Sequence, residues 1–242
     1  MRIIGIFFFT VIIIFSASGQ KVKTITKESF LTIEEYSVLK PNKNVRNGTY
    51  IKKMKYDGEI LVNGNYNENR KIGIWDYYDF RTWKLEQKYD YDNNLIVYSE
   101  PSFLDRTVLN HFNYNGEWIF DELDSLPILI GGISDLKLQL TEEACNYTKV
   151  PNFPKAGIAI FSFIITKDGK TRDYKILNSS GNTFENKLLK FLMEHPGNWL
   201  PAMHHGEYVD TEFFIPMNIR YIENSQELKR FTIDFNSSLI SN

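Results

Sequence analysis

Few side chains of this 242-residue chain have types and spacing that suit chemistry. Cys145 is the single cysteine and follows Leu136, Leu140 and Ala144 at close to helical spacing, so we expect a small buried side chain. A Cys–His nucleophile would need one of the four histidines beside it in space, which sequence spacing does not indicate. A single cysteine also excludes an intramolecular disulfide.

The other reactive types also lack the partners that a catalytic or metal site needs. His204-His205 lies in a polar turn, and only Glu207 and Asp210 stand near it as further metal ligands. The acidic pairs Glu142-Glu143 and Asp121-Glu122 suit solvated positions better than an acid/base pair. Phosphate-binding loops and nucleophile-elbow motifs are absent from the sequence. We therefore expect a binding protein with no catalytic residue, cofactor or metal.

Composition indicates a folded protein that does not bind nucleic acid. Hydrophobic residues make up 43% and aromatic residues 15% of the chain, which is ample for one or two packed domains. The formal net charge is -2, without the basic patch that nucleic-acid binding requires.

The N-terminus has the pattern of a secretory signal peptide in residues 1–19. Arg2 precedes an apolar run from Ile3 to Phe15, and Ala17-Ser18-Gly19 supplies small residues before a cleavage expected at Gln20. The run is shorter than the roughly 20 residues of a membrane-spanning helix, so we expect an exported, periplasmic chain with no stable membrane span. An uncleaved inner-membrane anchor is the alternative.

Residues 20–120 alternate short apolar runs with turn signals, which is typical of antiparallel hairpins. Turns are predicted at four Asn- or Gly-containing pairs: Asn47-Gly48, Asp57-Gly58, Asn63-Gly64 and Asn93-Asn94. A Gly-x-aromatic unit recurs at Gly48, Gly64 and Gly73. On these residues the stretch 47–80 resembles MORN repeats and the related antitoxin-type repeats.

Aromatic residues cluster at the end of this repeat region. They are Trp75, Tyr77, Tyr78, Phe80 and Trp83. They form either an aromatic surface for a glycan, lipid or protein, with Trp75, Tyr77, Tyr78 and Trp83 as its residues, or the core of a thin sheet. The core is favoured because rings must supply most of the buried area there.

From residue 121 onward the pattern changes to a small module with both helices and strands. It predicts a helix over 133–145, a strand over 158–166, a hairpin at 167–170, a strand over 171–177, a helix around 184–193 and a last strand over 209–221. The predicted fold class is α+β, with hairpin repeats (20–120) before this module (121–225). The tail, 226–242, adds a short strand or is disordered.

Several separated motifs of this module resemble the C-terminal domain of the TonB energy-transducer family. They are Gly131-Gly132 before the first helix, Pro154, Ala156 and Gly157 before a strand, Asp168-Gly169 at the hairpin, Trp199-Leu200-Pro201-Ala202, Gly206, and Ile215-Pro216. The resemblance covers residues 126–221 and implies recognition of a protein or peptide by β-strand addition to an exposed sheet edge.

The last strand is the expected edge, because Pro216 cannot donate to a ladder. The predicted peptide-binding residues are Phe213, Phe214, Ile215, Asn218 and Arg220. The resemblance implies a segment of an outer-membrane receptor as the partner. A homodimer is a further possibility that the sequence does not decide. The sequence thus predicts an exported, non-enzymatic adaptor of the cell envelope. The alternatives are a glycan- or lipid-binding module acting through the aromatic repeats, and an energy transducer if residues 1–19 are retained.

Overall fold

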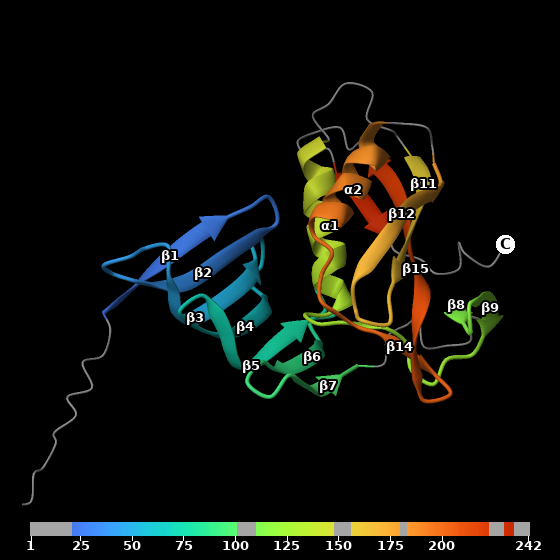
Figure 1. Ribbon diagram of the computed structural model, residues 1–242. Coiled ribbons are helices and arrows are strands. Elements are labelled where there is room, and N and C mark those ends of the chain that lie inside the picture. Colours follow the sequence, from blue (N-terminus) through green and yellow to red (C-terminus); the bar gives the residue numbers. More distant parts are fainter. Residues whose placement is uncertain (1–20, 101–109, 148–155, 180–182, 223–229, 235–242) are drawn as a thin grey trace, which may run out of the picture.

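Two seven-stranded antiparallel sheets, a small two-stranded sheet and two helices make up the described part of the computed structural model (Figure 1). The structure describes residues 21–100, 110–147, 156–179, 183–222 and 230–234. The predicted signal peptide and its cleavage site lie outside the described residues. In the described part of the chain, neither helix is long and apolar enough to cross a membrane.

The first sheet is a seven-stranded meander in which each strand pairs with the next in sequence, in the order β1 to β7. Its strands are β1 (Val22–Glu28), β2 (Thr32–Leu39), β3 (Arg46–Met54), β4 (Ile60–Asn67), β5 (Arg70–Tyr78), β6 (Leu85–Asp90) and β7 (Leu95–Ser99). This arrangement needs only local hairpins, as the closely spaced turn signals indicated.

Two of the four predicted turns are confirmed, and two are wrong. Gly58 and Asn94 lie between strands with positive φ. Gly48 and Gly64 instead lie inside β3 and β4. At Gly64 a Cβ would stand 2.2 Å from Trp75 Cδ2, so this glycine makes room for the indole ring that crosses it.

The second sheet has the strand order β12-β11-β15-β8-β9, and β14 and β16 pair with the long strand β15. Its strands are β8 (Asn110–Tyr114), β9 (Glu117–Asp121), β11 (Ala156–Ile165), β12 (Thr171–Asn178), β14 (Ala202–His204), β15 (Glu207–Ile222) and β16 (Arg230–Asp234). Helices α1 (Ile133–Tyr147) and α2 (Thr183–Glu194) pack on it, and β10 (Ile128–Leu129) pairs with β13 (Trp199–Leu200).

The predicted fold class, α+β, is wrong. The chain is mostly antiparallel β, and the described residues contain only two helices. The difference arises because the module gains strands from outside it. β8 and β9 come from the end of the predicted hairpin region and join β15, and β16 is the short strand that was one of the two alternatives for the tail. Residues 110–121 form a hairpin around Asn115-Gly116, both with positive φ, and this hairpin pairs with β15 ahead of the division predicted at residue 121.

Each sheet has its own core, and α1 contributes to both. Leu136, Leu140 and Ala144 belong to the core of the second sheet, whereas Leu138 packs in the aromatic core of the first. A helix with apolar residues on two faces can pack between two layers. In Figure 1, α1 lies between the first sheet and the remainder of the second region.

Candidate functional site

The inner face of the first sheet carries three rows of side chains, which the strand register fixes. Directly opposed residues share a face, so Glu34, Lys52, Val62 and Tyr77 form the row nearest α1. A second row holds Tyr50 and the Trp75 ring, which lies over Gly64. In the third row, Tyr66 of β4 opposes Lys71 of β5. Charged residues therefore flank an aromatic band.

Helix α1 is fastened to this sheet by polar contacts at both of its ends. Near its N-terminus, the Glu86 carboxylate accepts the backbone N–H groups of Ile133 (2.9 Å) and Ser134 (3.2 Å). Further along the helix, Glu142 accepts hydrogen bonds from Ser29 Oγ, Leu31 N and Thr32 Oγ1. The two regions are thereby held in a fixed relation.

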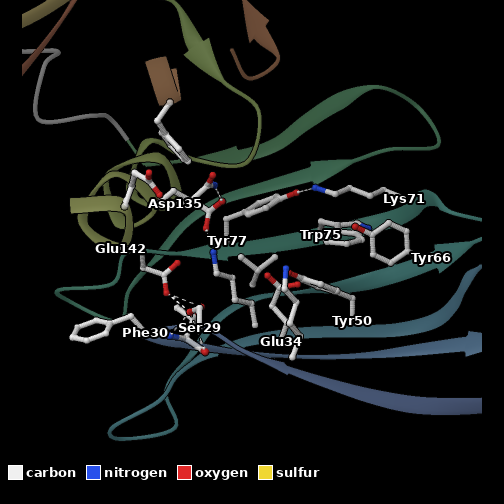
Figure 2. Close-up of a pocket in the computed structure, with 17 residues that line it drawn as sticks. Ser29, Phe30, Glu34, Tyr50, Tyr66, Lys71, Trp75, Tyr77, Asp135 and Glu142 are labelled. Atoms are coloured by element: carbon white, nitrogen blue, oxygen red, sulfur yellow. Dashed lines mark hydrogen bonds and ion pairs between the residues drawn. The ribbon is translucent and has the colours of Figure 1, made fainter. Parts of the chain in front are cut away.

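A cleft of about 490 Å³ remains between α1 and the inner face of the first sheet, and we call it the junction cleft (Figure 2). Its lining combines rings from β3, β4 and β5 with Asp135, Gln139, Glu142 and Glu143 from α1. Figure 2 shows Asp135 and Glu142 on one side of the cleft and Lys71 on the other. Both regions are needed to form it.

The α1 side of the cleft is acidic. Lys52 Nζ lies 2.7 Å from Asp135 Oδ1, and both groups are largely buried. Burial alone would lower the pKa of Lys52, but attraction to Asp135, with smaller contributions from Glu142 and Glu34, outweighs it and raises that pKa. One ammonium group therefore interacts electrostatically with three carboxylates, of which Asp135 is its ion-pair partner.

Lys71 marks the other side of the cleft and has a different environment. Its Nζ donates to the hydroxyls of Tyr77 (3.1 Å) and Tyr91 (3.2 Å) and lies 4.3 Å from the Trp75 ring centroid. Burial lowers the pKa of Lys71 to about 8. Attraction to Asp135 opposes this shift, and repulsion from Arg46 and Lys52 adds to it. Within the described residues no carboxylate forms an ion pair with this amine.

The predicted aromatic surface is divided between core and cleft. Trp75 and Tyr77 are 1% and 3% exposed, so the interpretation of these two rings as core is confirmed. Both also line the junction cleft. Tyr78 and Trp83 are half-buried, and Trp83 contacts Tyr56 at the hairpin turns instead of joining the cleft.

The predicted peptide-binding strand, β15, lies inside the second sheet. Asn218 and Arg220 pair with β11 on one side and with β16 on the other, so these two positions are not at a free edge. The cause is that residues 230–234 return and pair with the strand that was expected to be last. Phe213 and Ile215 point into the core, and Phe214 is half-buried on the other face.

The remaining reactive side chains have structural surroundings. Cys145 is buried, as predicted, and burial raises the pKa of its thiol to about 12. His204 packs against Phe112 and Tyr114, and its Nδ1 lies 3.0 Å from the carbonyl oxygen of Glu122. In the described part of the chain, no group of three His, Cys, Asp or Glu side chains is arranged to hold a metal ion.

Sequence reasoning missed the charged residues of the cleft, although a signal was present. Lys52 has the same strand parity as Tyr50 and Met54, both of which face the core. A charged residue at an inward position of a strand needs a buried partner, and α1 supplies it through Asp135. Comparisons with protein-family models, curated proteins and solved structures found no match to this chain.

Proposed function

We propose that this chain is an exported, non-enzymatic binding protein of the bacterial cell envelope that takes its ligand in the junction cleft. The observation that carries the proposal is the cleft itself, whose volume of about 490 Å³ is in the range typical of ligand pockets. It combines aromatic rings with a few charged groups, a lining that can bind and orient a ligand.

The chemistry of the lining favours binding over catalysis. Its reactive groups are lysines, carboxylates and tyrosine hydroxyls, and burial raises the pKa of Tyr77 and of Tyr50, which keeps both phenols protonated. Ion pairs, hydrogen bonds and ring contacts are what such a set provides. The envelope location is proposed from the signal-peptide pattern and from the resemblance to MORN repeats and to the TonB C-terminal domain.

A second candidate function is recognition of an extended peptide by strand addition to β15. One observation favours it. Between Thr211, which pairs with β8, and Asn218, which pairs with β16, the strand has β11 as a partner on one side and no described strand on the other. A peptide seated there would lie beside Phe213, Phe214 and Ile215, three of the five predicted binding residues.

Chemical-shift mapping on the isotope-labelled chain from residue 20 distinguishes the two sites. The probes are short free peptides, peptides blocked at both ends, neutral oligosaccharides and extended eight-residue peptides. The Trp75 indole N–H, which donates to the carbonyl oxygen of Asn65 (3.2 Å), reports on the cleft, and the amides of Phe213–Met217 report on β15.

Ligand-dependent shifts that centre on Tyr50, Lys71 and Trp75 are the expected result. Shifts confined to β15 would instead establish the second candidate. If no probe moves the cleft signals at millimolar concentration, the junction cleft is not a ligand site and the main proposal fails.

A further inference from the structure

The junction cleft has two ends of opposite charge, which restricts the ligand it can accept. At the α1 end, Lys52 is bonded to Asp135, and Glu34 is its direct neighbour across the β2–β3 pair. Lys52 donates to Asp135, and the Glu34 carboxylate, although it attracts the Lys52 charge, accepts no hydrogen bond in the part of the chain that the structure describes. A half-buried carboxylate is therefore available to a cationic group.

The opposite end offers a cation. The Lys71 ammonium has three N–H donors, and neutral tyrosine hydroxyls accept two of them. The rings of Trp75, Tyr77 and Tyr91 surround it, at 4.3, 5.5 and 5.0 Å from their centroids. Ring quadrupoles stabilise the charge only in part, so an anionic ligand group would gain a charge-assisted hydrogen bond there.

The strand geometry sets the length of ligand that reaches both ends. Val62 in the row nearest α1 and Tyr66 in the third row are four residues apart on β4, which is about 13 Å at the rise of an antiparallel strand. The Lys71 side chain reaches back from the third row over the Trp75 ring, which shortens this span. Three extended residues span roughly 10 Å.

We propose that the junction cleft binds a short peptide with both termini free, with its ammonium group at Glu34 and its carboxylate at Lys71. This inference rests on the proposed function and adds the ligand class to it. The peptide body lies in the part of the cleft between these two ends, where Tyr50 and Tyr66 belong to the lining.

Charge complementarity favours this occupant over other envelope ligands. Three lysines, Lys27, Lys52 and Lys71, line the cleft against four carboxylates, Glu34, Asp135, Glu142 and Glu143. A phosphate dianion bound at Lys71 would add repulsion from these carboxylates, and a neutral glycan would give neither Glu34 nor Lys71 a charge-assisted hydrogen bond. A zwitterion supplies one such bond to each of the two groups.

The test uses calorimetric titration of the chain from residue 20 with trialanine, its C-terminal amide and its N-acetyl form at pH 7 and low salt. Each blocked form should bind roughly 10- to 100-fold more weakly than trialanine, because each loses one charge-assisted contact. In Lys71→Met the penalty for amidation should vanish, and in Glu34→Gln the penalty for acetylation should vanish. This crossed pattern assigns each terminus to one residue.

Lys53→Met is the matched control, because Lys53 is the next residue of β3, faces the other side of the sheet and pairs with Glu35 (2.6 Å). It should retain the affinity of the wild type for all three peptides. Thermal unfolding of every variant confirms that the fold is intact.

Four outcomes would overturn the inference. Equal binding of free and blocked peptides, or penalties that persist unchanged in both variants, would show that the termini are not read at these residues. Tighter binding of a neutral oligosaccharide at the cleft signals would replace the ligand class while leaving the proposed function intact. Absence of trialanine binding would exclude the ligand class, and only absence of cleft shifts with every probe would remove the proposed function as well.

Discussion

The two sheets of this chain are stabilised by different kinds of core. The buried cluster of the second sheet consists of leucine, isoleucine, alanine, phenylalanine, methionine and tryptophan side chains and contains no buried tyrosine. The cluster of the first sheet has four buried tyrosines, Tyr50, Tyr66, Tyr77 and Tyr89, around Trp75. One core is closed and apolar, whereas the other is built from rings that carry polar ends.

The difference follows from what covers each sheet. Helices α1 and α2 both pack on the second sheet, so aliphatic side chains there are shielded on every side. The first sheet receives only Leu138 from α1 as a fully buried helical residue. Tyrosine suits such a partly covered face, because its ring is buried while its hydroxyl reaches a polar partner. A partly covered face is also where a cleft can remain.

The sharpest test of this contrast compares one large side chain from each core. Phe161→Ala in the second core should lower the free energy of unfolding by about 3–5 kcal/mol, because the closed core cannot refill the cavity. Tyr50→Ala in the first core should cost roughly half as much, since water from the adjacent cleft can enter the space. Urea unfolding of both variants measures the two losses, and equal losses would refute the contrast.

Much of the local structure could be predicted from the sequence. The apolar stripe predicted a helix over 133–145 and the structure has α1 at Ile133–Tyr147, because helical periodicity is a local property. The β8–β9 hairpin lies in the region where hairpins were predicted, but its turn at Asn115-Gly116 was not named. Its pairing with β15, which depends on residues almost a hundred positions away, was not predicted. The prediction of the fold class was therefore wrong because it depended on strand pairing between residues far apart in the sequence.

The site was harder to predict than the fold. Trp75 and Tyr77 were singled out by composition, and both line the cleft. Lys71 and Asp135 could not be connected, because the cleft exists only once α1 has docked on the first sheet. The alternation of side chains along a strand can indicate that a lysine points inward. Only the tertiary arrangement shows which residue that lysine contacts.

The next prediction concerns the contact that holds the N-terminus of α1 on the first sheet. Glu86→Ala removes the carboxylate that accepts the first-turn N–H groups of α1, leaving Ile133 and Ser134 without that partner. The expected loss is roughly 1.5–3 kcal/mol, because hydrogen bonds to a charged acceptor at a helix N-terminus are lost. Hydrogen exchange at these two amides should accelerate, whereas Glu117→Ala on the exposed strand β9 should leave them unchanged. Unchanged exchange in Glu86→Ala would mean that α1 docks without this contact.

A smaller effect is expected from Gly64→Ala, which tests how tightly the aromatic band is packed. The added Cβ would lie 2.2 Å from Trp75 Cδ2, so the buried indole must shift, and the loss should be about 1–3 kcal/mol. Combining the change with Trp75→Leu should remove most of that additional loss, because the clashing ring is gone. Strictly additive losses in thermal unfolding would show that the ring is not what requires glycine at this position.

The smallest expected change has the opposite sign and comes from Lys71→Met. At pH 7 the Lys71 amine is charged in both the folded and the unfolded chain, but burial lowers its folded pKa from 10.5 to about 8, so folding with the charge is unfavourable. Methionine removes this penalty, and the variant should be more stable than the wild type by about 1–2 kcal/mol.

The pH dependence identifies the cause of that gain. Between pH 8 and 10.5 the unfolded wild-type chain binds more protons at Lys71 than the folded chain does, so wild-type stability rises with pH relative to the variant and the gap closes. Tyrosine ionisation acts in both proteins, so urea unfolding of the pair at pH 7 and pH 10 isolates the lysine. A variant that is less stable at pH 7 would assign Lys71 a structural role. A stabilised variant that no longer distinguishes a free carboxylate from its amide would show that the first sheet retains a destabilising charge because the ligand requires it.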